Sequence, residues 1–165
     1  MRSIWQIPIL FVFYVCAIST SVSSLPSSEN LEVGGLRLGQ NVQEAKVSLL
    51  PPYRLDANSY IRDANGTKVG RVRFRDGRIS RIEFLARLTV GKGQRRLLSP
   101  GESLEESRAK LYELSTRAVE DTILCSVSKR GERLVLYFTQ EPKLLDSGVL
   151  DTASGRDKIP SIPTF

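Results

Sequence analysis

Beyond position 30, hydrophobic residues recur first at helical spacing and then at alternate positions, and this pattern occurs twice along the chain. Each occurrence opens with a capping-box arrangement, in which Asn41 precedes Glu44, and Ser103 precedes Glu106, by three residues. A stripe of apolar residues at the spacing of one helix face follows each cap: Val42, Ala45, Leu49 and Leu50, then Leu104, Leu111, Leu114 and Ala118. The pattern therefore predicts a short helix that stops at a Pro-Pro pair, and a second, longer helix.

Alternating hydrophobicity predicts strands after both helices. The predicted strands are 54–62, 69–75 and 78–88 in the first part of the chain, and 122–128 and 133–140 in the second. In the first hairpin, a three-residue loop at 75–77 would place four apolar residues on one face: Val72, Phe74, Ile82 and Phe84. In the second hairpin, an even-numbered loop would gather six residues inside: Ile123, Cys125, Val127, Leu134, Leu136 and Phe138. Together these elements predict an α+β fold, with an antiparallel sheet and helices packed on one of its faces.

The domain boundaries follow from the same pattern, which places a single α+β domain at residues 31–145. Within it, units at about 33–88 and 97–145 share the motif Gly-x-[Asn/Ser]-[Val/Leu]-x-Glu, which favours two tandem helix-plus-hairpin units. A chance match is the alternative, because capped helices resemble one another. Residues 146–165 contain few apolar residues and two prolines, so we expect a flexible tail.

The N-terminus has the order of a secretory signal. A positive start at Arg2 precedes the apolar run from Ile4 to Ile18, and small residues follow up to Ser24. Residues 1–24 are therefore predicted to be a signal peptide, which makes the protein periplasmic or extracellular. The alternative is an uncleaved anchor through Ile4 to Ile18, although this run is shorter than the roughly 20 residues that span a bilayer.

Composition narrows the chemistry that the chain can perform. It has 41% hydrophobic and 25% charged residues, which are proportions of a folded globular protein. It contains no histidine, and its two cysteines are Cys16, in the apolar N-terminal run, and Cys125. We interpret Cys125 as a buried apolar side chain rather than a nucleophile, because no imidazole exists to activate it. Usual zinc and copper sites and a recognisable catalytic set are lacking, so we predict no metal, no cofactor and no enzymatic activity.

Arginine is concentrated on one predicted hairpin. Arg71, Arg73 and Arg75 alternate along one strand, and Arg81 lies on the next. Like charges that face each other across strands repel, so a purely structural sheet gains nothing from them. Arginine also grips carboxylate or phosphate groups with paired hydrogen bonds. The four arginines are therefore the candidate partner-binding face, and a solvated outer face balanced by nearby acids is the alternative interpretation.

The segment 36–52 (LRLGQNVQEAKVSLLPP), followed by 72–79 (VRFRDGRI), resembles the small exported domains of the SmpA/OmlA type. Members of that family are outer-membrane assembly lipoproteins, and the beta-lactamase inhibitory protein is similar to a tandem pair of such units. The chain departs from the family at Pro51, where the family prefers glycine. The resemblance implies a two-layer domain that acts by binding other proteins.

These observations predict a non-enzymatic, exported binding module that contacts an envelope protein or an anionic surface. Its net charge of +6 is compatible with such partners. A nucleic-acid partner is disfavoured because no aromatic residues alternate with the arginines, and membrane contact is expected only through an uncleaved N-terminal segment. A secreted inhibitor or ligand-sequestering protein is the alternative function, and a hydrolytic enzyme without a recognisable motif is the third.

Overall fold

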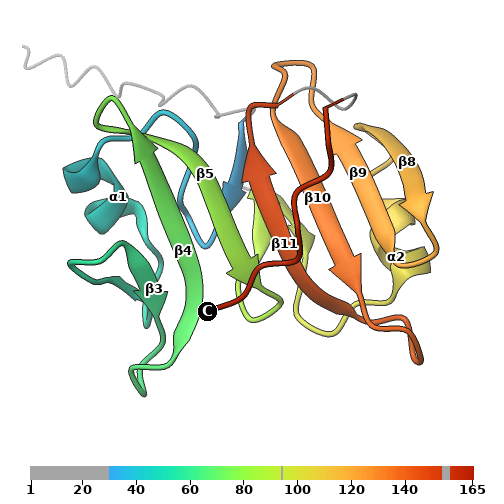
Figure 1. The fold of residues 1–165 in the computed structure, drawn as a ribbon, viewed down its shortest axis with the longest axis horizontal. Helices are drawn as coiled ribbons and strands as arrows, with labels where there is room; N and C mark the ends of the chain where they lie inside the picture. The colour runs from blue at the N-terminus through green and yellow to red at the C-terminus, as the bar shows by residue number, and fades with distance from the viewer. Residues whose placement is uncertain (1–29, 94, 154–156) are drawn as a thin grey trace, which may run out of the picture.

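The computed structural model describes residues 30–93, 95–153 and 157–165, and two antiparallel β-sheets dominate them (Figure 1). The larger sheet has eight strands in the order β2-β3-β4-β5-β11-β10-β9-β8, and the smaller has the order β1-β6-β7. The predicted signal peptide, residues 1–24, lies outside the described residues. None of the helices in the described part of the chain is long and apolar enough to cross a membrane.

The elements along the chain are β1 (Leu31–Val33), α1 (Val42–Ser48), β2 (Arg54–Leu55), β3 (Tyr60–Arg62), β4 (Lys68–Arg75), β5 (Arg78–Leu85), β6 (Val90–Lys92), β7 (Arg95–Leu98), α2 (Leu104–Lys110), β8 (Ser115–Glu120), β9 (Ile123–Val127), β10 (Arg133–Phe138) and β11 (Leu145–Asp151). The large sheet thus runs inward from β2 to β5 and outward again from β11 to β8. Its central pair joins the two ends of the domain, because β5 and β11 pair antiparallel between Arg81 and Asp151 at one end and between Leu85 and Ser147 at the other.

The prediction of an α+β fold with helices packed on the sheet is wrong. Among the described residues, strands account for 45% and helices for 11%. Both capping boxes are present as predicted, and Asn41, for example, accepts hydrogen bonds from the backbone of Gln43 and Glu44. However, each helix has only seven residues, and α2 ends at Lys110. Ala118, expected at the end of that helix, lies in β8, because pairing with β9 overrides the helical pattern of this segment.

The prediction of a flexible tail at 146–165 is wrong for its first six residues. They belong to β11, which lies between β5 and β10. Val149 is buried against one face of the sheet and Leu150 against the other, so the strand is apolar on both sides. Among the described residues of this segment, 152–153 and 157–165 lie outside helices and strands, and Figure 1 shows that 157–165 extend across the sheet towards β4.

The main core lies on one face of the large sheet, which we call the inner face. Phe84 and Leu136 on this face share a buried cluster with residues of the small sheet, such as Val33 and Leu98. The small sheet therefore supplies part of the opposing side of the core, together with residues of α1 and of the segment after α2, such as Ala45 and Leu111. The inner face is tightly packed, because a Cβ added to Gly148 would lie 2.5 Å from the Phe84 ring.

The first hairpin buries the predicted apolar residues, but its turn differs from the predicted three-residue loop. Asp76 and Gly77 form a two-residue turn with positive φ at both positions. A bulge, at which Ser80 is the additional residue, restores the parity that a three-residue loop would have provided. Val72, Ile82 and Phe84 are buried in the main core and Phe74 packs against it, as predicted.

In the second hairpin, the predicted face of β9 is wrong. Ser128 pairs with Glu132, which leaves a three-residue loop instead of an even one. Cys125 therefore stands opposite Val135 rather than beside Leu134. Leu134, Leu136 and Phe138 face the main core as predicted, whereas Ile123 and Cys125 belong to a second cluster on the opposite, outer face.

Candidate arginine site on the outer face

The four predicted site residues all lie on the β4–β5 hairpin at the outer face. Across the two strands, Arg71 stands opposite Glu83, and Arg73 stands opposite Arg81. Arg75 follows Arg73 by two residues on β4, so it lies on the same face near the end of the strand. The four arginines thus share one face, as the alternation within the strands predicts, but the structure divides them between two environments.

Arg71 is separated from the other three. Its guanidinium lies over the ring of Tyr60 at 5.3 Å, and Lys68 lies over the same ring at 4.2 Å. These cation–π contacts hold the two side chains of β4 against Tyr60 of β3. Arg71 therefore contributes positive charge to the face without reaching the pocket described next.

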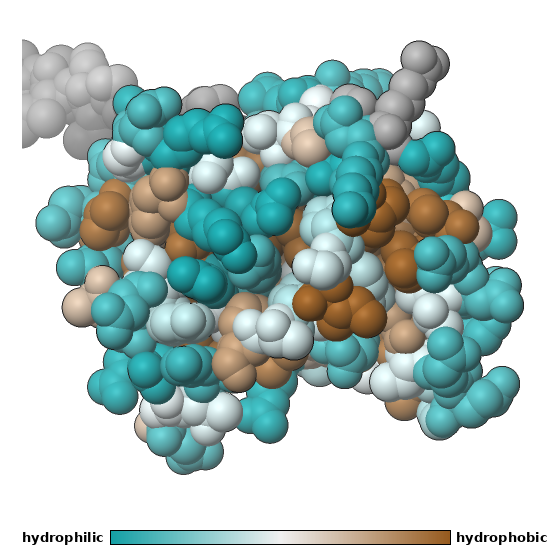
Figure 2. Space-filling model, viewed as in Figure 1, coloured by the Kyte–Doolittle hydropathy of each residue, from teal (hydrophilic) through white to brown (hydrophobic). Residues whose placement is uncertain are grey.

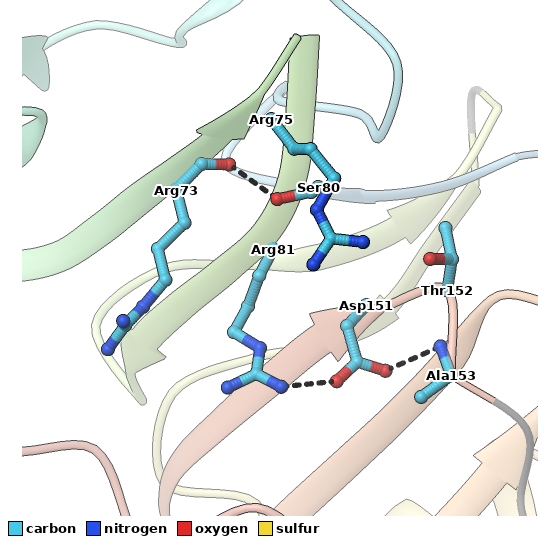
Figure 3. A pocket seen from close by; sticks show the side chains of 7 residues that line it. All are labelled: Arg73, Arg75, Ser80, Arg81, Asp151, Thr152 and Ala153. Carbon is cyan, nitrogen blue, oxygen red and sulfur yellow. Dashed lines mark hydrogen bonds and ion pairs between the residues drawn. The ribbon is translucent and has the colours of Figure 1, made fainter.

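A pocket of about 460 Å³ opens where β4, β5 and β11 meet, and we call it the arginine hollow (Figure 3). Its lining is Arg73, Arg75, Ser80, Arg81, Asp151, Thr152 and Ala153. In Figure 3, the side chain of Arg75 extends past Ser80 into the hollow, and Arg81 points at Asp151. The head of Arg73 turns away from the centre.

An ion-pair network runs from the hairpin to the central strand. Arg73 donates from Nε to Oε1 of Glu83 at 3.0 Å and from Nη2 to Oε2 at 3.4 Å. Arg81 contacts Asp151 Oδ2 at 3.2 Å and, more distantly, Glu83 Oε1 at 3.8 Å. Because Glu83 reaches both arginines, it offsets the repulsion between Arg73 and Arg81, which face each other across the strands.

Asp151 is anchored from below by a buried arginine that the sequence analysis missed. Arg133 donates from Nε to Oδ1 at 3.0 Å and from Nη2 to Oδ2 at 2.9 Å. The side chains of Arg133 and Asp151 are only 2% and 5% exposed. The hydrogen bonds to Asp151 raise the pKa of Arg133 above its ordinary value. The available signal was an arginine at the start of an apolar strand, but its partner lay in the presumed tail.

The C-terminal segment 157–165 covers the outer face next to the hollow. Arg133 Nη1 donates to the carbonyls of Asp157 and Lys158 at 3.4 and 3.3 Å, and the Tyr137 hydroxyl donates to the carbonyl of Pro160. Burial raises the pKa of Tyr137 to about 12. Figure 2 shows hydrophilic surface over β4 and β5, and hydrophobic surface over β9 and β10 beside this segment.

Cys125 is buried, as predicted, although on the outer face. It belongs to the small apolar cluster with Val135, Tyr137 and Val149, against which Ile159 of the C-terminal segment packs. Within the ranges that the structure describes, no three acidic or cysteine side chains are grouped to hold a metal ion. The chemistry available at the outer face is therefore that of guanidinium groups and paired carboxylates.

Comparisons with known proteins add no relative to this description. No family model matches the chain, and neither the curated proteins nor the solved structures give a significant match.

Proposed function

We propose that this chain is a non-enzymatic, exported binding module that recognises an acidic protein or an anionic surface through the arginine hollow. The observation that supports the proposal is the lining itself. Three arginine side chains from two strands border one pocket, and Asp151 is the single carboxylate among them. Arginine forks suit carboxylate and phosphate oxygens, and a recessed position strengthens such contacts relative to a flat surface.

Binding fits the hollow better than acid–base chemistry does. Asp151 already accepts hydrogen bonds from Arg133, Arg81 and the backbone N–H of Ala153. Its oxygens are therefore already occupied by donors and are not free to contact a substrate. The hydroxyl of Ser80 donates to the carbonyl of Arg73 at 3.2 Å, so it too is engaged.

The proposal can be tested with a pair of variants that lose the same charge. Arg75→Ser/Arg81→Ser removes the two guanidinium groups nearest the centre of the hollow, whereas Arg54→Ser/Arg108→Ser removes two exposed arginines outside its lining. Binding to poly-L-glutamate is measured by titration at several salt concentrations, and circular dichroism checks that each variant is folded. We expect the hollow variant to lose far more affinity than the control.

Equal losses in the two variants would show that binding depends only on net charge, and would reject the hollow as the site.

Export is tested separately. The mass of the protein recovered outside the cytoplasm distinguishes cleavage near residue 24 from a retained N-terminal segment.

A further inference from the structure

The charges around the arginine hollow do not balance. Glu83 is engaged by both Nε and Nη2 of Arg73, and Asp151 is engaged in the same two-point manner by the buried Arg133. Each carboxylate therefore has one arginine that matches its geometry and neutralises its charge. Arg81 has only secondary contacts with these two acids, at 3.2 and 3.8 Å.

Two positive charges remain, and both face the hollow. The side chain of Arg75 forms no hydrogen bond or ion pair with any residue that the structure describes. Arg81 shares acids that are already satisfied by other arginines. The charged residues that line the hollow are Arg73, Arg75, Arg81 and Asp151, which gives three positive charges and one negative charge, a surplus of two. In Figure 3, the heads of Arg75 and Arg81 lie on either side of the space above Asp151.

We propose that the arginine hollow binds the dianionic phosphate group of a phosphate monoester, held between Arg75 and Arg81; this rests on the proposed function. A phosphate monoester carries a charge of about −1.5 to −2 at pH 7 and has three acceptor oxygens, which can serve two guanidinium forks at once. A single carboxylate neutralises one charge only and leaves the second arginine without a partner. A phosphodiester likewise carries one charge.

The group can come from a soluble phosphate compound or from a lipid whose headgroup ends in a phosphate monoester. The pocket is open and its volume of about 460 Å³ leaves room for an attached group. Thr152 and Ala153 border it on the β11 side, and we expect the remainder of the ligand to extend over these two uncharged residues.

The test uses the full chain and inorganic phosphate, sulfate and acetate as probes, with binding followed by NMR of the arginine side chains. We expect phosphate and sulfate to bind more tightly than acetate at about pH 7.5. Lowering the pH from about 7.5 to about 5 converts inorganic phosphate from mainly the dianion to the monoanion, and should weaken its binding by about tenfold. Sulfate keeps its charge over this range and therefore controls for any effect of pH on the protein itself.

Arg75→Ser should reduce phosphate affinity at least severalfold, and Arg108→Ser should leave it unchanged. Phosphatidylcholine vesicles that contain phosphatidic acid are compared with vesicles that contain phosphatidylglycerol, a diester. Selective binding to phosphatidic acid identifies a lipid source, and phosphate binding without that selectivity identifies a soluble one.

Acetate binding as tight as phosphate, or phosphate binding unaffected by Arg75→Ser, overturns the inference. If the hollow variant still binds poly-L-glutamate more weakly than its control does, the proposed function survives that result. If it does not, both proposals fail.

Discussion

The buried pair between Arg133 and Asp151 should be the most sensitive polar contact of the outer face. Replacing Arg133 by methionine keeps much of the side-chain volume but leaves the buried Asp151 carboxylate with the partly exposed Arg81, at 3.2 Å, and the backbone N–H of Ala153 as its partners. It also removes the contacts to the carbonyls of Asp157 and Lys158. The variant should therefore be less stable, and its C-terminal segment should be held less firmly.

The size of this loss follows from the contacts. Removing one partner of a buried ion pair costs about 3–5 kcal/mol, because the other charge remains buried without compensation. Arg81 is 34% exposed and still reaches Asp151, so we expect a value near the lower limit, about 3 kcal/mol. Asp151→Asn should cost a similar amount, since the Arg133 guanidinium keeps its charge at any accessible pH. The double variant should cost less than the sum of the two.

Urea unfolding followed by circular dichroism measures these free energies, provided that the slope with denaturant is unchanged. Arg37→Met is the matched control, because Arg37 pairs with Glu32 at 3.1 Å but is 39% exposed. That surface pair should contribute less than about 1 kcal/mol. The expectation is wrong if Arg133→Met lowers the free energy of unfolding no more than the control does. It is also wrong if the losses in Arg133→Met and Asp151→Asn simply add in the double variant, because interacting residues should not be additive.

Three further outcomes are expected on the same face and in the core. In a Cys16→Ser background, removing residues 157–165 should make Cys125 react with thiol reagents, whereas Cys125 of the untruncated protein should be protected. Equal reactivity would show that the C-terminal segment does not cover Cys125. The free energy of unfolding should fall as pH rises between about 10 and about 12, because unfolded Tyr137 ionises first, and Tyr137→Phe should flatten this fall in denaturation curves. Gly148→Ala should destabilise the protein by about 1–3 kcal/mol in urea, since the added methyl would meet the Phe84 ring.

Features with local causes could be predicted from the sequence. The two capping boxes depend on residues three apart, and both form as expected. The faces of β4 and β5 follow from alternation within each strand, so the arginines share a side in the structure as in the pattern. Even where the turn at Asp76 and Gly77 differed from the prediction, a bulge at Ser80 preserved the inner face, because burial of the apolar residues dominates over loop length.

Features that depend on distant pairing could not be predicted. The segment containing β11 is poor in apolar residues outside Val149 and Leu150, and nothing local shows that it enters the centre of a sheet. The same applies to α2, whose apolar stripe continues into a strand because β9 lies beside it. The parity of the β9–β10 loop also failed, because both faces of β10 are buried and hydrophobicity alone could not identify the inner one.

The arginine hollow depends both on a local pattern and on the pairing of distant strands. Its cations come from a hairpin that the sequence identifies, whereas Asp151, Thr152 and Ala153 come from a segment roughly seventy residues later that the sequence dismisses. Without β11, Arg81 and Arg133 would both lose their hydrogen bonds to Asp151. The burial of Arg133 beneath the outer face would then have no carboxylate to compensate its charge. The placement of Arg75 and Arg81 about a recessed site thus depends on the pairing of β5 with β11, and a chain shortened before residue 151 should retain the arginines but lose the geometry that holds them.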